Sequence, residues 1–298
     1  MINSMRPTTF DEIIGQDSVI ERLRIMSYGC KSSGQIMPHV LIDGPPGLGK
    51  TTIASAIANE IGVNLYTVNA ATVRSIKNII PYLMNLEPRS VLFIDEIHRL
   101  PKLVEEFLYP VMEDFRIDML VENKPDSIDL PIFTMVGATT SGGSLSQPFY
   151  DRFTMKEHLS FYSSDVLAEL ARSNADKLGL SLSNNQMVEI AERSKGTPRI
   201  LNSRLQWYKN YITSYPEKKE DINYIFESQG IDKNGFDCND QKYIDILKKN
   251  RANPIGLKAM SSMTGIAMET IENSIEPYMI RMGYVLRTQK GRLLGKVK

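Results

Sequence analysis

Residues 40–61 read VLIDGPPGLGKTTIASAIANEI, and this stretch decides the fold. The apolar run Val40–Ile42 predicts a short buried strand, and the residues from Thr52 onward have the spacing of a helix. Between them, GPPGLGKT at residues 44–51 has the GxxxxGK[ST] spacing of a phosphate-binding loop, and a loop between strand and helix is the context in which that pattern is specific. The alternative, a glycine-rich turn without a ligand, would not need both Lys50 and Thr51.

The chemistry of this loop predicts nucleotide binding. Glycines let backbone N–H groups turn inward toward a phosphate, and the helix that follows adds the positive end of its dipole. We expect Lys50 to reach the β- and γ-phosphates of ATP, and the Thr51 hydroxyl to bind Mg²⁺.

Outward from the loop, residues 40–160 alternate short apolar runs with helical patterns. Strands that alternate with helices of this length predict βαβ units, and therefore an α/β fold with a parallel sheet covered on both faces. The expected strands are residues 40–42, 64–68, 91–94 and 132–136, and the expected helices are residues 52–61, 75–86 and 101–112.

From Ser163 onward the pattern becomes helical. Three helices are expected at residues 165–178, 184–193 and 199–211, and the polar, proline-broken segment 214–221 ends this bundle. After a second boundary at residues 229–239, helices are expected at residues 240–250, 257–263 and 269–281, followed by extended runs at residues 284–287 and 292–294. Three helices and a hairpin are typical of a winged helix.

Composition limits the class of protein. The chain has 298 residues, of which 42% are hydrophobic and 23% charged, as in a folded protein of two or three domains. It has no apolar stretch of about 20 residues, so we expect no membrane span. Its first residues lack the basic and apolar regions of a signal peptide. The only cysteines, Cys30 and Cys238, are too far apart in a chain without CxxC to indicate a disulfide scaffold or a zinc ribbon, so a reducing cytoplasm is expected.

Charge is distributed unevenly along the chain. The net charge is zero, but residues 241–298 carry 11 Lys and Arg against 4 Asp and Glu. This excess predicts a contact with a polyanion at the C-terminal end. A basic tail exposed to solvent is an equally open alternative on charge alone.

Acidic and hydroxyl groups follow two further expected strands. The run 91–94 ends in Asp95 and Glu96, and we expect this strand to lie beside the strand of the phosphate loop. Asp95 could then hold the magnesium ion, and Glu96 could polarise the attacking water; the alternative is a pair of acids that cap the next helix. His98 is expected to be a surface or capping residue. Thr140, after the strand at 132–136, could sense the γ-phosphate.

Two arginines complete the expected site. Arg152 follows the last strand, and Arg199 opens a helix of the bundle. An arginine at the γ-phosphate stabilises the charge of the transition state. The alternative for each residue is a surface ion pair.

These motifs together resemble a known family. The order GPPGLGKTT, VLFIDEIHRL, LYPVMEDF, GATT, DRF, GTPR and RTQKGR is similar to that of the AAA+ ATPases, and most closely to the RuvB family of Holliday-junction branch-migration motors. The resemblance covers nearly the whole chain. It implies a large ATPase domain at residues 1–162, a small helical lid at residues 163–232 and a winged-helix DNA-binding head at residues 233–298. It also implies hexameric rings around duplex DNA.

The resemblance implies roles for individual residues. Arg152 matches the finger that reaches the nucleotide of the neighbouring subunit, and Arg199 matches the sensor arginine of the lid. Arg287 and Arg292 match arginines of the wing that contact DNA. The residues at nucleotide-contacting positions are Met5, Arg6, Gly47, Gly49, Lys50, Thr51, Thr52, Glu113, Asp114, Phe115, Arg152, Tyr162 and Arg199.

Residues 116–130 predict a hairpin, because apolar residues alternate on both sides of an Asn-Lys-Pro-Asp turn at residues 123–126. In RuvB-like proteins a hairpin here docks RuvA, the junction-binding partner; the alternative is a hairpin packed on its own sheet. The chain departs from the family pattern at Ser141 and Tyr150, where the family has arginine. Neither departure affects the expected nucleotide loop.

The predicted function is ATP-driven DNA translocation that moves Holliday junctions in recombination and repair, by a ring-shaped oligomer with a junction-binding partner. One alternative is a AAA+ switch of clamp-loader type, in which ATP only sets partner affinity. Another is a winged-helix regulator that binds nucleotide as a ligand. Glu96 argues against the regulator, because a protein that only binds nucleotide does not need a carboxylate that activates water.

Overall fold

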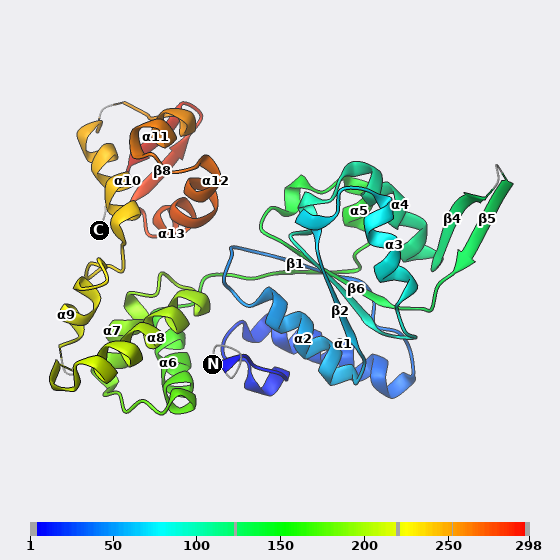
Figure 1. The fold of residues 1–298 in the computed structure, drawn as a ribbon, viewed down its shortest axis with the longest axis horizontal. Helices are drawn as coiled ribbons and strands as arrows, with labels where there is room; N and C mark the ends of the chain where they lie inside the picture. The colour runs from blue at the N-terminus through cyan, green and yellow to red at the C-terminus, as the bar shows by residue number, and fades with distance from the viewer. Residues whose placement is uncertain (1–4, 122–123, 219–220, 252, 296–298) are drawn as a thin grey trace. The chain divides into compact units, whose positions relative to one another are not determined.

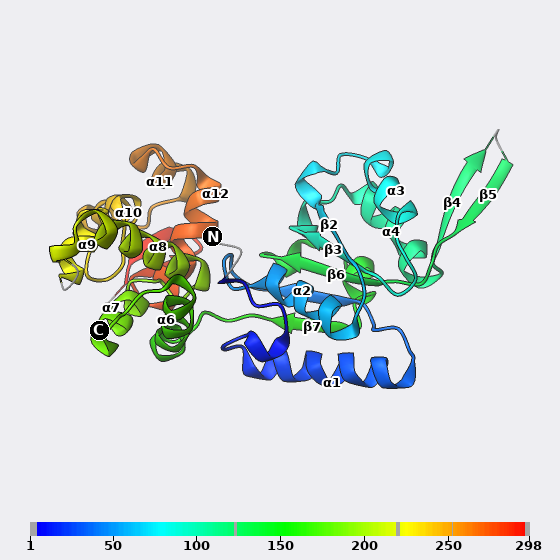
Figure 2. The same ribbon diagram turned by 60° about the horizontal axis from the view of Figure 1, so that its bottom comes forward.

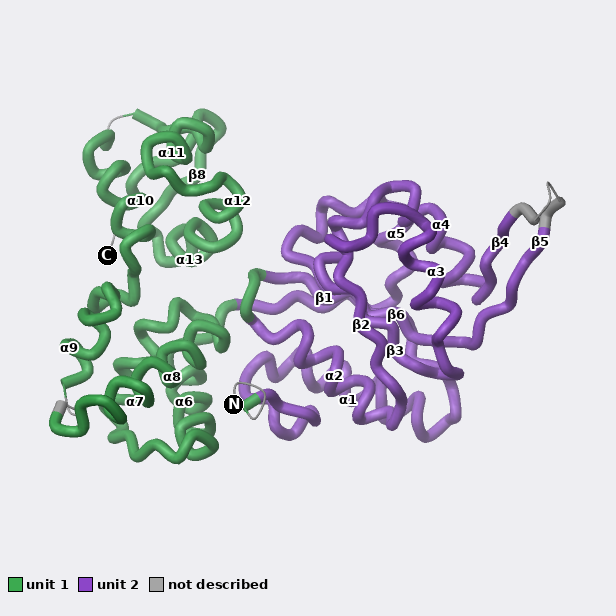
Figure 3. Tube along the Cα trace, in the orientation of Figure 1, with its two compact units in different colours: residues 1–5, 45–47, 161–298 green, residues 6–44, 48–160 purple. Residues whose placement is uncertain are grey.

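The computed structural model describes residues 5–121, 124–218, 221–251 and 253–295. These residues form two compact units, which Figure 3 shows in different colours. The sheet unit contains residues 6–44 and 48–160, and the lid–head unit contains Met5, Pro45–Gly47 and residues 161–295.

The sheet unit is built on five parallel strands. These are β1 (Val40–Asp43), β2 (Leu65–Asn69), β3 (Val91–Asp95), β6 (Thr134–Thr139) and β7 (Met155–His158). Their order is β2-β3-β6-β1-β7, so β6 lies between β1 and β3. The expectation that the strand before Asp95 lies directly beside the strand of the phosphate loop was therefore wrong. The chain crosses over and inserts β6 at the centre, an order that the pattern along the sequence does not specify.

Helices cover both faces of this sheet. They are α1 (Asp17–Ser33), α2 (Lys50–Ile61), α3 (Ile76–Met84), α4 (Lys102–Glu113) and α5 (Gln147–Asp151). Figures 1 and 2 show α1 and α2 on one face and α3 and α4 on the other. All six residues of β6 are buried, which is the reason that the central strands are apolar runs rather than alternating patterns. Three elements, α1, α5 and β7, were not expected from the sequence.

The predicted hairpin is formed by β4 (Arg116–Val121) and β5 (Lys124–Asp129). The strands pair antiparallel, with Ile117 opposite Ile128, and form a sheet of their own that extends from the body of the sheet unit (Figure 1). Ile117 is buried in the main core, so the base of the hairpin is fixed there. Part of the predicted turn, residues 122–123, lies outside the described residues.

The lid–head unit begins with a helical bundle. Its helices are α6 (Ser164–Leu178), α7 (Asn184–Glu192), α8 (Pro198–Ser214) and α9 (Ile222–Glu227). The side chains of Ser163, Ser183 and Thr197 each accept a backbone N–H at the start of a helix, which explains where α6, α7 and α8 begin.

The head follows in the same unit. It contains α10 (Cys238–Lys249), α11 (Leu257–Thr264), α12 (Met268–Thr270), the π-turn η7 (Ile271–Ile275), α13 (Glu276–Arg281) and the hairpin of β8 (Val285–Thr288) and β9 (Gly291–Leu294). The helix predicted at residues 269–281 therefore contains a π-helical turn at Ile271–Ile275. Pro277 has no N–H to donate to the carbonyl of Asn273, and a π-turn accommodates that loss. Residues 296–298 of the predicted basic tail lie outside the described residues. Within the described part of the chain, no helix is long and apolar enough to cross a membrane.

Candidate nucleotide and DNA sites

The phosphate loop leaves the carboxyl end of β1 through a glycine that no other residue could replace. Gly44 has a φ of 146°, and a Cβ atom there would lie 2.6 Å from the carbonyl oxygen of Leu159. Its N–H donates to the carbonyl of Thr139 at the end of β6, 3.2 Å away. Gly49, with a φ of 104°, then turns the chain into α2. The loop is therefore held against the carboxyl edge of the sheet, which is where ligands bind in open α/β folds.

Lys50 is the first residue of α2, and its side chain is folded over the loop. The residue is 9% exposed, and Nζ donates to the carbonyl of Gly44 at 2.6 Å. The first turn of α2 carries no acidic side chain, so nothing there opposes the binding of an anion to the helix terminus. Thr51 and Thr52 are half-buried in the same turn.

The predicted acidic pair lies at the same edge. Asp95 is the last residue of β3, and its Oδ1 accepts the N–H of Glu96 at 3.0 Å. Glu96 adopts the left-handed conformation, with a φ of 52°, and its carboxylate lies 3.0 Å from Nη1 of Arg99. Backbone strain of this kind is common at functional positions, and the side chain of Glu96 is 40% exposed. The hydroxyl of Thr51 and the carboxylate of Asp95 are oxygen donors of the kind that Mg²⁺ prefers.

A histidine connects this acidic turn to the end of β6. Nδ1 of His98 lies 3.0 Å from Oγ1 of Thr139, and the same hydroxyl accepts the N–H of Ser141 at 2.9 Å. Thr139 is buried, whereas the predicted sensor Thr140 lies one residue beyond the strand and is half-buried. His98 was expected to be a surface or capping residue, and the structure shows it half-buried beside Thr139. No signal along the chain indicates that residues 98 and 139 meet.

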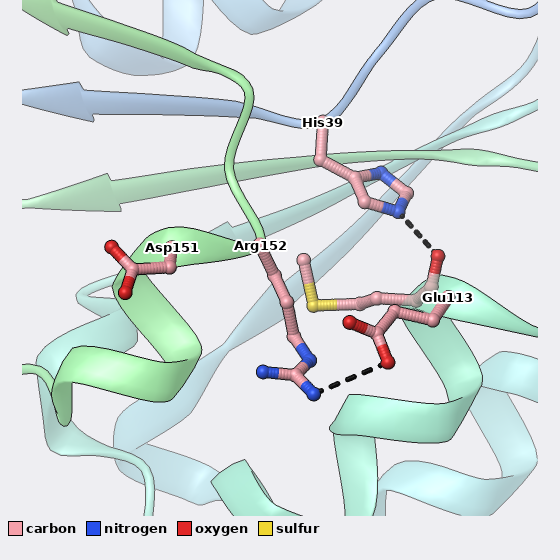
Figure 4. Close-up of a pocket in the computed structure, with 5 residues that line it drawn as sticks. His39, Glu113, Asp151 and Arg152 are labelled. Carbon is pink, nitrogen blue, oxygen red and sulfur yellow. Dashed lines mark hydrogen bonds and ion pairs between the residues drawn. The ribbon is translucent and has the colours of Figure 1, made fainter.

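Arg152 lies at the opposite, amino edge of the sheet, just before β7. It lines a pocket of about 280 Å³ together with His39, Met112, Glu113 and Asp151 (Figure 4). Its Nη2 lies 3.2 Å from Oε2 of Glu113, and its Nη1 donates to the carbonyl of Pro148 at 2.6 Å. The guanidinium also covers the ring of Tyr109, 4.2 Å from the centroid. Among the described residues, its buried Nε finds no hydrogen-bond partner.

His39, which sequence analysis missed, fixes this edge. One ring nitrogen contacts the carbonyl of Met112 at 3.0 Å, and the other accepts the N–H of Met135 at 2.9 Å. Burial lowers the pKa of His39, so the ring is neutral and can donate on one side while it accepts on the other. The carbonyl of His39 accepts the N–H of Met155, so the same residue also anchors the strand that follows Arg152.

Strand pairing separates the predicted nucleotide residues into groups. Val40 pairs with Met155 at the amino edge, and Asp43 pairs with His158 at the carboxyl edge. Lys50, Thr51 and Asp95 lie at the carboxyl edge, whereas the Glu113–Phe115 segment and Arg152 lie at the amino edge. Four residues of strand separate the two edges by about 13 Å. The structure therefore does not bring Arg152 to the phosphate loop of its own chain.

The other predicted nucleotide residues lie mainly in the lid–head unit. The N–H of Arg199 donates to the carbonyl of Gly47 at 3.3 Å, and the N–H of Tyr162 donates to Gly196 at 2.9 Å. The side chain of Met5 is buried in this unit, whereas Arg6 belongs to the sheet unit and is exposed. Arg199 is exposed.

The two wing arginines differ in how far their side chains are exposed to solvent. Arg287 and Arg292 pair across the β8–β9 hairpin, but the side chain of Arg287 is 58% exposed and that of Arg292 only 8%. Nε of Arg292 donates to Oε1 of Glu276 at 2.8 Å, and Glu276 also accepts the hydroxyl of Tyr243 at 2.8 Å. Arg292 was predicted to contact DNA, yet here its guanidinium is buried against a carboxylate. Arg292 therefore ties the hairpin to the helices of the head, and Arg287 is the more exposed of the two arginines.

Comparisons with known proteins agree with this architecture. Family models described as the Holliday junction DNA helicase RuvB P-loop domain, the RuvB AAA lid domain and the RuvB C-terminal winged helix domain match residues 5–159, 162–229 and 233–297. The predicted α/β P-loop core with a lid and a winged helix is thereby confirmed.

Individual relatives are similar over nearly their full length. The Holliday junction branch migration complex subunit RuvB of Rhodopirellula baltica is 39% identical over 97% of this chain and 81% of its own. The subunit of the same name from Campylobacter hominis is 41% identical over 98% of this chain and 88% of its own. A solved structure of the Thermotoga maritima RuvB Holliday junction branch migration motor has a TM-score of 0.91 at 35% identity, and the match covers 98% of this chain and 96% of that one.

Proposed function

Because this chain belongs to the RuvB family of Holliday junction branch migration motors, we propose that it hydrolyses ATP to move Holliday junctions in recombination and repair. One observation carries the mechanism. The phosphate loop and the acidic pair lie at one edge of the sheet, and Arg152 lies at the other. A single chain therefore holds both parts of a hydrolytic site but cannot bring them together.

The carboxyl edge performs the chemistry in this proposal. Lys50 and the amino end of α2 hold the phosphates of ATP, and Glu96 orients a water for in-line attack on the γ-phosphate. Thr51 and Asp95 would hold Mg²⁺, which neutralises phosphate charge when bound. Thr140 and Arg199 register the loss of the γ-phosphate and change the position of the lid.

A second copy of the chain supplies the missing arginine. Arg152 and the Glu113–Phe115 segment of one copy meet the nucleotide on the carboxyl edge of the next, and repetition of this contact produces a ring, for which we propose six copies. The exposed Arg287 contacts the phosphates of duplex DNA. The β4–β5 hairpin docks a RuvA-like junction-binding protein. A motor that works on chromosomal DNA acts in the cytoplasm, where we place this chain.

The direct test is movement of a synthetic four-way junction with heterologous arms. With ATP and the RuvA-like partner, we expect the wild-type protein to separate the junction into two forked duplexes, because the strands of the heterologous arms cannot pair with their new partners. With a non-hydrolysable ATP analogue, the protein should bind the junction and leave it in place. Equal conversion with ATP and with the analogue would contradict a motor.

Glu96→Gln should lower ATP turnover by about 10²- to 10⁴-fold, because an amide cannot accept the proton of the attacking water. Affinity for ATP should stay within a few-fold, since Lys50 and the loop are unchanged. A phosphate-release assay and nucleotide titration measure the two effects. The matched control is Glu106→Gln on α4, which removes an exposed carboxylate of the sheet unit and should leave turnover unchanged.

Arg287→Ala should weaken duplex binding and reduce its salt dependence by about one unit of slope, because one phosphate contact is lost. DNA-free ATP turnover should be unaffected, since Arg287 lies in the head. Fluorescence anisotropy with a labelled duplex across a salt series measures both affinity and slope. Unaltered affinity would remove the wing from the DNA site.

A further inference from the structure

The exposed arginine of the wing, Arg287, already forms an ion pair with a carboxylate of the same unit. Oε1 of Glu272 lies 3.1 Å from Nη2 of Arg287 and 3.2 Å from Nη2 of Arg292. One carboxylate oxygen thus accepts from both arginines of the hairpin. The side chain of Glu272 is 36% exposed, so solvent and ligands can reach it.

The charges of this cluster cancel. Arg292 is matched by Glu276, which is 1% exposed, and Arg287 is matched by Glu272. Two guanidinium groups and two carboxylates leave this four-residue cluster with no net charge. A phosphate that approaches Arg287 must therefore compete with Glu272.

The position of Glu272 follows from the local backbone. Glu272 lies in the π-turn η7, and Glu276 begins the helix that continues from it. The two carboxylates have different environments: Glu276 is enclosed with Tyr243 and Arg292, whereas Glu272 lies at the open side of the hairpin. Glu276 therefore belongs to the core of the head, and only Glu272 can leave its partner without exposing a buried group.

We propose that Glu272 is an affinity-determining residue that competes with DNA phosphate for Arg287 and so lowers the affinity of the head for duplex DNA. This inference rests on the proposed role of the wing in DNA binding. A motor must release each contact before it takes the next, and an intramolecular carboxylate favours release. Arg287 exchanges one anionic partner for another, so neither the bound nor the released state leaves its charge without a partner.

The test is the variant Glu272→Gln, which removes the charge and keeps the shape. Exposed ion pairs have small energies, so we expect duplex affinity to rise by about two- to five-fold at moderate salt. The dependence of affinity on salt concentration should become steeper, because a freed arginine displaces additional counterions from DNA. A gain in affinity is a result that damage to the fold would not produce.

Controls separate this competition from a general change in charge. Glu269→Gln removes the same charge from an exposed glutamate of α12 that pairs with no described cation, and it should have a smaller effect on both affinity and slope. In an Arg287→Ala background, Glu272→Gln should lose most of its effect, because the contested arginine is absent. All measurements use the full chain, a labelled duplex and a non-hydrolysable ATP analogue.

The outcomes are distinguishable. Tighter and more salt-dependent binding by Glu272→Gln, reduced in the double variant, supports the inference. If Arg287→Ala weakens binding while Glu272→Gln leaves it unchanged or equals Glu269→Gln, the inference is overturned and the DNA site of the wing survives. If Arg287→Ala itself has no effect, the proposed role of the wing fails and the inference fails with it.

Discussion

Replacing Arg152 with alanine should lower ATP turnover by about 10³-fold or more, although the residue lies far from the phosphate loop of its own chain. In the proposed function, the guanidinium stabilises charge that develops on the γ-phosphoryl group of a neighbouring copy, because Arg152 lies at the edge of the sheet opposite Lys50. ATP affinity of the dilute chain should change little. Steady-state phosphate release at concentrations that favour assembly is the measurement.

Mixing experiments show whether the arginine acts between copies. Arg152→Ala chains retain the phosphate loop, and Lys50→Ala chains retain the arginine, so a mixture should recover part of the turnover that each variant lacks alone. Arg24→Ala, which breaks an exposed ion pair with Asp11, is the matched control and should behave as wild type. Full turnover by dilute monomers, together with no recovery in the mixture, would exclude a shared site.

Lys195→Met should destabilise the lid–head unit by about 3–5 kcal/mol. The side chains of Lys195 and Asp240 are 8% and 2% exposed, and the two form an ion pair that joins the lid to the first helix of the head. A second carboxylate oxygen, on Asp237, lies 3.7 Å from Nζ. Removal of the lysine leaves a buried carboxylate without its cation, which is the costly case for buried pairs.

The stability that Lys195→Met loses should depend on pH in a defined direction. Burial raises the pKa of Asp240, and Lys195 opposes that rise. Without Lys195 the folded-state pKa rises further above that of the unfolded chain, so the variant binds a proton more readily when folded. Its stability should therefore be highest at acid pH and fall as the pH rises through the folded-state pKa.

Trp207 provides the readout for both effects. It is the only tryptophan, and its Nε1 donates to the carbonyl of Ile225 within the lid, so its fluorescence reports this unit and not the sheet unit. Urea unfolding of wild type and Lys195→Met at several pH values gives the change in free energy. The control Lys248→Met breaks an exposed pair with Asp245 and should cost less than about 1 kcal/mol. If Lys195→Met lowered the free energy of unfolding by no more than this control, the buried ion pair would not stabilise the connection between the lid and the head.

The sequence specified local features well. The loop around Lys50 was predictable, and the strands expected at residues 91–94 and 132–136 were found at Val91–Asp95 and Thr134–Thr139, because glycine spacing and apolar runs act over a few residues. Relations between distant segments were not predictable. The position of β6 between β1 and β3, the contact of His98 with Thr139 and the role of His39 all depend on how strands pair.

The wing illustrates the same limit. Arg287 and Arg292 have similar surroundings along the chain, yet one is exposed and the other is buried. The difference arises because Glu276 and Tyr243, from two helices of the head, enclose only Arg292. Residue type and motif position identify a pair of cations, and only tertiary packing shows which of them can meet a ligand.

The separation of Arg152 from the phosphate loop has a consequence for assembly. In the proposed assembly, each copy contributes its phosphate loop to one contact and its Arg152 to another, so the subunits would join head to tail and the contact would not be self-complementary. Two copies alone would complete a single catalytic centre and leave another idle. Only a closed ring would place an arginine at every ATP, so an isolated protomer would hydrolyse ATP slowly.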